Sequence, residues 1–207
     1  MKKKLTYLVV FLCASMTHAS IKSIAAVDDL MARLNSMSSM SATFKQEVME
    51  GRRVIQASTG RLFLQRLDKF RWQSNSPTSQ LIVSNGHTLW VYDKDLEQVT
   101  MTTLDKKNQS TPILLLNGYE QSLKDGYDVS IKKFNSQSVF HLIPKNPEKN
   151  AYLWIDLTYQ KNKLKRLTVE DKLGQITRLM LFNASLNLKL EPTLFTFTPP
   201  EGVDIVQ

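Results

Sequence analysis

Few residues of this chain have the types and spacing that catalysis needs. No serine lies in a Gly-x-Ser-x-Gly turn, and neither a Gly-rich phosphate loop nor a His-x-x-Glu-His metal motif is present. Of the three histidines, His18 falls in an N-terminal leader, His87 directly follows the Asn85-Gly86 turn, and His141 alternates with apolar residues in a strand pattern. The sequence therefore disfavours an enzyme and predicts neither a metal nor a cofactor. An acyl hydrolase that brings a serine to His87 or His141 stays as an alternative.

Charged residues do not identify a site either. Residues 93–95 resemble a carboxylate pair, but a charged turn between two strands explains them better. The densest basic run spans residues 161–166, which could touch anionic lipid or an acidic partner but is typical of a solvated hairpin end. Nucleic-acid binding would need a stronger and more clustered positive charge.

The N-terminus has the pattern of a secretory signal peptide. Residues 2–4 are lysines, residues 5–16 are largely apolar, and residues 17–19 provide small residues for cleavage. The apolar run of twelve residues is shorter than the roughly 20 that span a bilayer. We expect a signal peptide over residues 1–19 and a single mature domain over residues 20–207. Loss of three lysines lowers the basic count from 27 to 24 against 19 acidic residues, so the net charge falls from +8 to +5.

The lone cysteine, Cys13, lies inside this leader, so the mature chain is expected to have no disulfide and no thiolate site. A lipidated cysteine would follow small residues at the end of the apolar run. Here the bulky residues Val10, Phe11 and Leu12 precede it. We therefore expect a mature protein that carries no acyl chain.

Hydrophobic periodicity indicates a protein made mainly of strands. Apolar residues at helical spacing predict an amphipathic helix over residues 24–37. A shorter apolar helix is expected over residues 110–118, where a capping serine and a proline precede four apolar residues and an Asn-Gly end. Strands are predicted at residues 40–50, 54–65, 69–73, 80–84, 88–93, 98–103, 127–134, 138–143, 152–157, 164–170, 176–186 and, briefly, 195–198.

These elements predict a mainly β fold. About eleven strands joined mostly as hairpins form a large antiparallel sheet, which should curve rather than lie flat. The simplest arrangement is an unclosed half β-barrel with the N-terminal amphipathic helix and the short mid-chain helix laid across its concave side as a lid.

Some strands are apolar on both faces. Leu89 and Val91 alternate with Trp90 and Tyr92, whereas an antiparallel strand with one wet face should alternate apolar and polar residues. Either both faces are buried, or apolar surface is available for binding. The mid-chain residues 113–116 would look the same as a core plug or as a movable lid.

Several stretches, in the same order from about residue 25 to the C-terminus, closely resemble the LolA family of periplasmic outer-membrane lipoprotein carriers. Each stretch is modest alone, but together they are specific. The matching stretches are Asp29-Leu30-x-x-Arg33-Leu34, Ser41-Ala42-Thr43-Phe44-x-Gln46, Val83-Ser84-Asn85-Gly86-x-Thr88-Leu89-Trp90-x-Tyr92, Glu97-Gln98-x-Thr100, Thr111-Pro112 and Phe195-Thr196-Phe197-Thr198-Pro199-Pro200-x-Gly202-Val203.

The resemblance implies a periplasmic, probably monomer-sized carrier domain whose apolar cavity shelters the acyl chains of lipoproteins. It also implies loading by an inner-membrane ABC-type complex and unloading by an outer-membrane receptor. Arg66 matches the family's arginine that holds the lid helices, and Phe70 and Trp72 fall on matching positions of the same segment. The residues assigned to lipid or lid binding are Leu30, Leu34, Arg66, Phe70, Trp72, Leu89, Trp90, Ile113, Leu114, Leu115 and Leu116.

Two other readings stay open. An exported lipid- or lipoprotein-binding sensor of the same fold would bind acyl chains without delivering them. An outer-membrane receptor is disfavoured, because the residues before Cys13 make a poor lipidation site. From its position alone, Arg66 could also be a surface arginine at the end of a strand.

Overall fold

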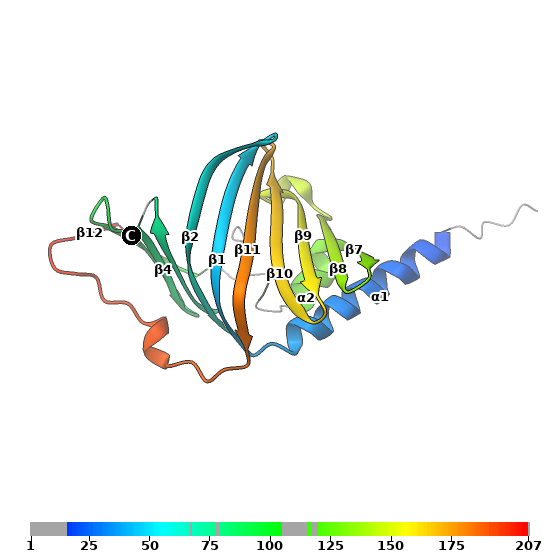
Figure 1. The fold of residues 1–207 in the computed structure, drawn as a ribbon, viewed down its shortest axis with the longest axis horizontal. Coiled ribbons are helices and arrows are strands. Elements are labelled where there is room, and N and C mark those ends of the chain that lie inside the picture. Colours follow the sequence, from blue (N-terminus) through cyan, green and yellow to red (C-terminus); the bar gives the residue numbers. More distant parts are fainter. Residues whose placement is uncertain (1–15, 67, 78, 105–115, 117–119, 207) are drawn as a thin grey trace, which may run out of the picture.

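Within the residues that the computed structural model describes (16–66, 68–77, 79–104, 116 and 120–206), twelve strands form one strongly curved sheet (Figure 1). The strand order is β12-β6-β5-β4-β3-β2-β1-β11-β10-β9-β8-β7. Neighbouring strands are antiparallel, except that β12 runs parallel to β6. Because β12 and β7 are the two edges and do not pair, the sheet stays unclosed, which confirms the predicted fold class.

The elements with printed bounds follow one another through short turns. They are α1 (Met16–Asn35), β1 (Ser39–Glu50), β2 (Arg53–Gln65), β3 (Lys69–Ser76), β4 (Gln80–Asn85), β5 (Thr88–Asp93), β6 (Gln98–Thr103), α2 (Glu120–Gly126), β7 (Tyr127–Phe134), β8 (Gln137–Pro144), η2 (Pro147–Lys149), β9 (Tyr152–Gln160), β10 (Lys163–Asp171), β11 (Gln175–Leu186), η3 (Pro192–Phe195) and β12 (Asp204–Val206).

The turn between β4 and β5 shows how local sequence sets the strand register. Gly86 has a φ of 95°, which a residue with a side chain rarely adopts. The Asn85 side-chain oxygen accepts hydrogen bonds from the backbone N–H groups of His87, at 2.9 Å, and Thr88, at 2.8 Å. The hairpin predicted at this Asn-Gly pair is confirmed.

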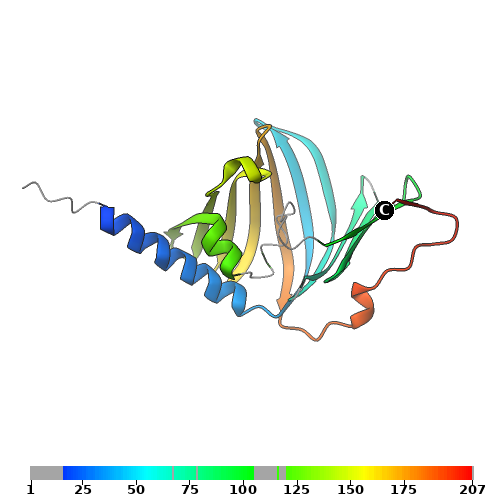
Figure 2. The ribbon, with the colours of Figure 1, turned by 180° about the vertical axis from the view of Figure 1, so that it is seen from behind.

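Helices α1 and α2 both lie on the concave side of the sheet (Figure 2). The predicted amphipathic helix is confirmed, but it begins at Met16 rather than Ile24 and ends at Asn35. Its apolar stripe is buried against the sheet, with Leu30 0% and Leu34 1% exposed. None of the helices in the described part of the chain has the length and apolar character needed to cross a membrane.

Two sequence predictions differ from the structure. Residues 195–198 are not a strand: Pro192–Phe195 forms a 3-10 helix, and the last strand is β12 instead. A proline-rich segment cannot supply a continuous row of N–H donors for a sheet ladder. The mid-chain helix over residues 110–118 lies outside the described residues, apart from Leu116, which is fully buried. Helix α2 was not predicted, since its seven residues are too few for a clear periodic signal.

The segment after β11 covers the convex face of β3, β4 and β5. Phe195 of η3 is 2% exposed, and η3 packs against β3 and β4. The Arg71 guanidinium donates a 3.3 Å hydrogen bond to the Leu194 carbonyl oxygen, and the Phe197 ring lies 5.7 Å from that of Tyr92. The apolar residues on the second face of these strands are therefore matched by a covering segment of the same chain.

A glycine in β2 makes room for an aromatic stack on the concave face. Gly60 pairs directly with Phe44, and a Cβ added at Gly60 would lie 2.0 Å from the Gln73 carbonyl oxygen and 2.6 Å from Phe44 Cζ. The Phe44 ring also stacks on the Trp72 ring, with centroids 3.8 Å apart. Any side chain at residue 60 would displace this stack.

We predict that Gly60→Ala lowers the free energy of unfolding by about 1–3 kcal/mol, the usual cost of forcing extra atoms into a packed core. For a chain of this length, the melting temperature should fall by about 2–4 °C for each kcal/mol. Gly126→Ala is the matched control, because no atom lies within 4 Å of its added Cβ. Equal melting temperatures for the two variants would contradict this account of Gly60.

Candidate functional site: an apolar cavity beneath the helices

The concave face carries a cavity of about 360 Å³, formed by strands from both halves of the sheet. This volume lies within the roughly 300–1,000 Å³ typical of small-molecule sites. The residues that line the cavity are mostly apolar, and they are Gln46, Phe70, Trp72, Gln80, Ile82, Leu89, Val91, Tyr152, Leu167, Val169, Thr177 and Leu179. An elongated hydrocarbon group is the kind of ligand that such walls can bind.

The structure brings together some of the predicted site residues. Phe70, Trp72 and Leu89 line the cavity. Trp90 does not, because it follows Leu89 in β5 and successive side chains in a strand point to opposite faces. The expectation for Trp90 came from an apolar run in which the sequence did not distinguish the two faces.

The other predicted residues are in the core or outside the described residues. Leu30, Leu34 and Leu116 belong to the buried core between the helices and the sheet, and they do not line the cavity. Ile113, Leu114 and Leu115 lie outside the described residues. The predicted set therefore falls into a lining group and a packing group, which the sequence did not separate.

The cavity lining is electrically neutral. It contains no Asp, Glu, Lys, Arg or His among the described residues. Burial, with smaller contributions from Tyr127 and Asp171, raises the pKa of Tyr152 to about 12, so its phenol stays protonated at neutral pH. A charged group inside the cavity would lack a partner of opposite charge there, which makes its burial costly.

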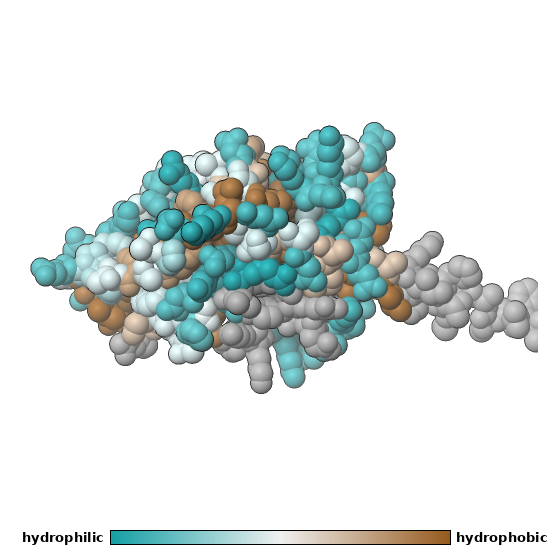
Figure 3. Space-filling model, turned by 90° about the horizontal axis from the view of Figure 1, so that it is seen from below, coloured by the Kyte–Doolittle hydropathy of each residue, from teal (hydrophilic) through white to brown (hydrophobic). Residues whose placement is uncertain are grey.

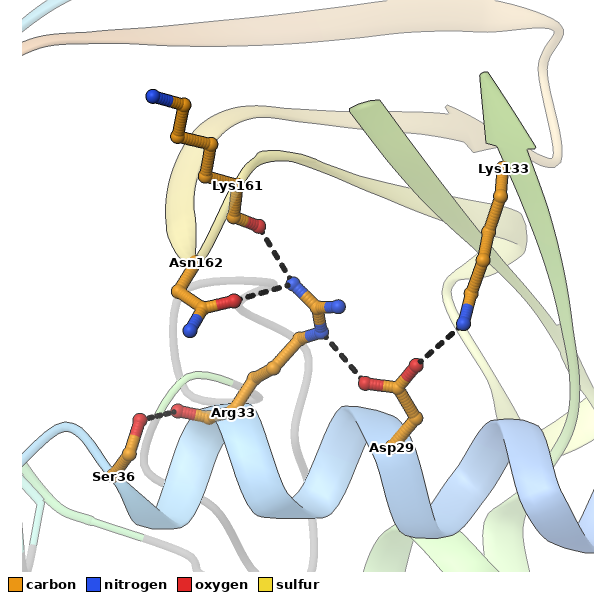
Figure 4. A network of polar contacts seen from close by, with 6 residues as sticks. All are labelled: Asp29, Arg33, Ser36, Lys133, Lys161 and Asn162. Atoms are coloured by element: carbon orange, nitrogen blue, oxygen red, sulfur yellow. Dashed lines mark hydrogen bonds and ion pairs between the residues drawn. The ribbon is translucent and has the colours of Figure 1, made fainter. Parts of the chain in front are cut away.

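Helix α1 fills the other part of the concave face and is held there by Arg33 (Figure 4). The Arg33 guanidinium donates to the Lys161 carbonyl oxygen at 2.8 Å and to the Asn162 side-chain oxygen at 3.5 Å, both in the β9–β10 turn. It also lies 5.4 Å and 5.2 Å from the ring centroids of Phe140 and Tyr159. These hydrogen bonds and cation–π contacts join the last turn of α1 to β8, β9 and β10.

Asp29 extends this network toward the edge strand β7. Its carboxylate accepts a 2.8 Å hydrogen bond from Arg33 Nε and lies 3.4 Å from Lys133 Nζ. Partial burial alone would raise the pKa of Asp29, but the hydrogen bonds and charges of Arg33 and Lys133 outweigh it and hold the pKa below its usual value. The ionised carboxylate therefore favours the docked position of α1.

Arg66 binds the C-terminal end of α1 from the opposite side. Its guanidinium donates to the Asn35 carbonyl oxygen at 3.3 Å and to the Asn35 side-chain oxygen at 3.0 Å. This contact is next to Leu34, where the sequence placed it. Within the described part of the chain, no hydrogen bond joins Arg66 to Leu116. The contact is solvent-exposed, so each bond contributes modestly to stability.

Sequence reasoning did not assign a role to Arg33 or Asp29. Their spacing of four residues on an amphipathic helix was a usable signal, because such pairs face each other on a helix surface. The contact with Lys161 had no such signal, since it joins residues 128 positions apart through a backbone carbonyl.

The outside of the molecule is mainly hydrophilic in the view from below, with apolar residues in separate patches (Figure 3). The two most exposed large apolar residues in the described part of the chain are Leu173, 86% exposed, and Leu96, 70% exposed, both at hairpin turns. No group of His, Cys, Asp and Glu residues suited to a metal ion occurs among the described residues.

The Asp29 pair predicts a pH-dependent stability difference. Because folding lowers the pKa of Asp29, its carboxylate stabilises the protein above the unfolded value of about 3.9, and this contribution is lost as the pH falls through the lower folded value. We expect Asp29→Asn to lower the free energy of unfolding by about 0.5–1 kcal/mol at pH 7 and by progressively less below about pH 3.9.

Urea titrations across this pH range would measure the difference. Asp28→Asn is the control, because Asp28 is 60% exposed and lies 3.7 Å from Lys124, and its effect should be smaller. A loss for Asp29→Asn that is the same at every pH would show that the ion pair does not cause it.

Comparison with known proteins agrees with this geometry. The family model described as "Outer membrane lipoprotein carrier protein LolA" matches residues 35–198. Outer-membrane lipoprotein carrier proteins from three organisms are similar along most of their length. The one from Legionella pneumophila is 40% identical over 178 residues, covering 86% of this chain and 88% of that protein. The one from Coxiella burnetii is 36% identical over 183 residues, covering 88% and 87%.

The third relative, from Pseudomonas aeruginosa, is 34% identical over 195 residues, covering 94% of this chain and 92% of that protein. Among solved structures, an uncharacterized conserved protein from Thermus thermophilus has a TM-score of 0.54 at 11% identity, covering 86% of this chain and 97% of that chain. This second likeness shows the fold alone. The family match and the three sequence relatives together place the chain in the LolA family of outer-membrane lipoprotein carrier proteins.

Proposed function

We propose that this protein carries lipoproteins between membranes by sheltering their acyl chains in the apolar cavity. The observation that carries the proposal is a neutral, apolar cavity on the concave face of a half-barrel, in a chain whose relatives are named outer-membrane lipoprotein carriers. The protein acts by binding and release, without catalysis. The acyl chains occupy the space between β3–β5 and β9–β11.

The energy of hydrocarbon burial sets how the cargo must be passed on. Each buried methylene contributes about 0.8 kcal/mol, so one chain of sixteen carbons contributes roughly 12 kcal/mol. Release into water would therefore be very slow, and transfer has to occur directly from one apolar cavity to another. An inner-membrane ABC-type complex is the proposed donor and an outer-membrane receptor the proposed acceptor. The carrier works in the periplasm as a monomer after cleavage of residues 1–19.

An exported sensor of the same fold is the alternative within the binding class, and it would hold acylated cargo without passing it on. The hydrolase alternative has less support. His141 Nδ1 lies 2.6 Å from an Asp156 carboxylate oxygen, and Ser130 is its cross-strand neighbour, but these three residues do not line the cavity. Within the described residues, no hydrogen bond joins His141 to a serine.

The direct test of the proposal is release of lipoproteins from spheroplasts. The mature protein should release newly made lipoproteins in a soluble equimolar complex. Val91→Glu should abolish release, because it places an unpaired carboxylate among the cavity walls. Thr103→Glu is the matched control, since Thr103 is exposed at the end of neighbouring strand β6, and it should release lipoproteins normally.

Release of no lipoprotein by the unchanged protein would contradict the carrier function. Equal release by the Val91→Glu and Thr103→Glu variants would instead show that the acyl chains are held elsewhere. Release into a complex that an outer-membrane receptor cannot unload would favour the sensor.

Arg66 should affect delivery more than loading. Arg66→Leu removes the two hydrogen bonds to Asn35 without removing an apolar side chain from the core. The docked position of α1 is then less favoured, so closure of the empty carrier contributes less to expelling the cargo. We expect near-normal loading and at least several-fold slower transfer to the receptor, measured with purified components.

Arg61→Leu is the control, because Arg61 is exposed on β2 and forms no hydrogen bond within the described residues. Asn35→Ala should slow transfer to a similar degree, and combining it with Arg66→Leu should add little, since both remove the same contact. Wild-type transfer by Arg66→Leu would remove Arg66 from the mechanism.

A further inference from the structure

A second, polar pocket adjoins the apolar cavity. Its volume is about 160 Å³, and Gln46, Trp72 and Gln80 line both pockets, so the two spaces are continuous. The residues that line this polar pocket are Gln46, Gln56, Ser58, Trp72, Ser74, Pro77 and Gln80. A ligand in the apolar cavity can therefore extend past Trp72 into a space lined by amides and hydroxyls.

The strand register explains why these amides gather. Gln46 and Ser58 are direct cross-strand partners in β1 and β2, and Gln56 is the partner of Val48, one step further along the same face. In a sheet, residues two apart in one strand point to the same side. The register therefore places the Gln46 and Gln56 side chains side by side at one end of the cavity, facing Gln80 of β4.

The hydrogen-bonding capacity of the glutamines is available to a ligand. Within the described part of the chain, the side-chain amides of Gln46, Gln56 and Gln80 form no hydrogen bond. Gln46 and Gln80 are half-buried, and Gln56 is exposed. Each amide offers two N–H donors and one oxygen acceptor. Ser74 differs, because its hydroxyl already bonds to the backbone of Gln80.

The polar pocket is also neutral, since no Asp, Glu, Lys, Arg or His lines it among the described residues. Neutral N–H donors suit carbonyl oxygens. A phosphate or carboxylate would normally be met by an arginine or lysine, whose charge-assisted hydrogen bonds are about twice as strong as neutral ones. The lining therefore favours an uncharged polar group attached to a hydrocarbon chain.

We propose that this pocket binds the ester and amide carbonyls through which acyl chains are joined to their cargo, with Gln46, Gln56 and Gln80 as the donors. The inference rests on the proposed carrier function and adds a specificity site to it. The apolar cavity takes the chains, and the polar pocket reads the neutral linkage at their start. Phospholipids carry the same ester carbonyls, but their phosphate would meet no cation here.

Competition binding with a fluorescent fatty acid would test this. The competitors are a synthetic lipopeptide with ester- and amide-linked palmitoyl chains, an ether-linked lipopeptide of equal chain length, and dipalmitoyl phosphatidylglycerol. The unchanged protein should prefer the ester lipopeptide to the ether analogue by about tenfold, as two or three neutral hydrogen bonds would give. It should prefer the ester lipopeptide to the phospholipid by at least as much.

The variant Gln46→Met/Gln56→Met keeps the side-chain volumes and should reduce the ester-to-ether preference to less than about threefold. The control Gln137→Met/Gln160→Met changes an exposed cross-strand pair of β8 and β9 and should keep the full preference. Melting temperatures would confirm that both variants fold.

The outcomes separate this inference from the carrier function. Equal affinity of the unchanged protein for both lipopeptides overturns the inference and leaves the carrier function standing. An unchanged preference in Gln46→Met/Gln56→Met, or equal competition by the phospholipid, also overturns it. Binding of neither lipopeptide overturns both proposals.

Discussion

The structure depends on one geometric constraint: a curved sheet of twelve strands has more concave surface than helix α1 can cover. An antiparallel sheet this wide must bend, because each strand is twisted relative to its neighbour. Helix α1 packs over β7, β8 and β9 and fills that half with leucines. The strands on the other side keep their apolar residues but have less to pack against, and the cavity lies there. The convex face of β3–β5 is closed separately by the C-terminal segment.

The attachment of α1 combines a buried face with modest, partly exposed polar contacts. Arg33 and Arg66 hold the end of α1 through hydrogen bonds that each contribute about 1 kcal/mol. One acyl chain contributes roughly ten times as much when it is buried. Cargo can therefore displace these contacts, and the contacts can re-form when the cargo leaves. Two anchors of this strength suit a helix that favours the empty form without preventing loading.

Sequence patterns predicted most of the strands because their signals are local. Alternation and the Asn85-Gly86 turn gave the hairpins, and the helical stripe containing Leu30 gave α1. The short strand β12 and the 3-10 helix around Phe195 were missed or misassigned, because three or four residues carry too little periodicity. Trp90 was placed in the cavity because alternation alone cannot say which face of a doubly apolar strand is inside. The Arg33 contact with Lys161 depends on tertiary packing, so no local pattern contained it.

The central claim is that acyl chains occupy the half of the concave face that α1 leaves uncovered. The most direct measurement is paramagnetic broadening of backbone amide signals by a lipopeptide with a spin label near the end of one acyl chain. The account predicts the strongest broadening at cavity residues such as Phe70, Leu89 and Leu167 and much weaker broadening at Val129 of β7. Strongest broadening on the convex face, at residues such as Tyr92 or Phe197, would contradict it.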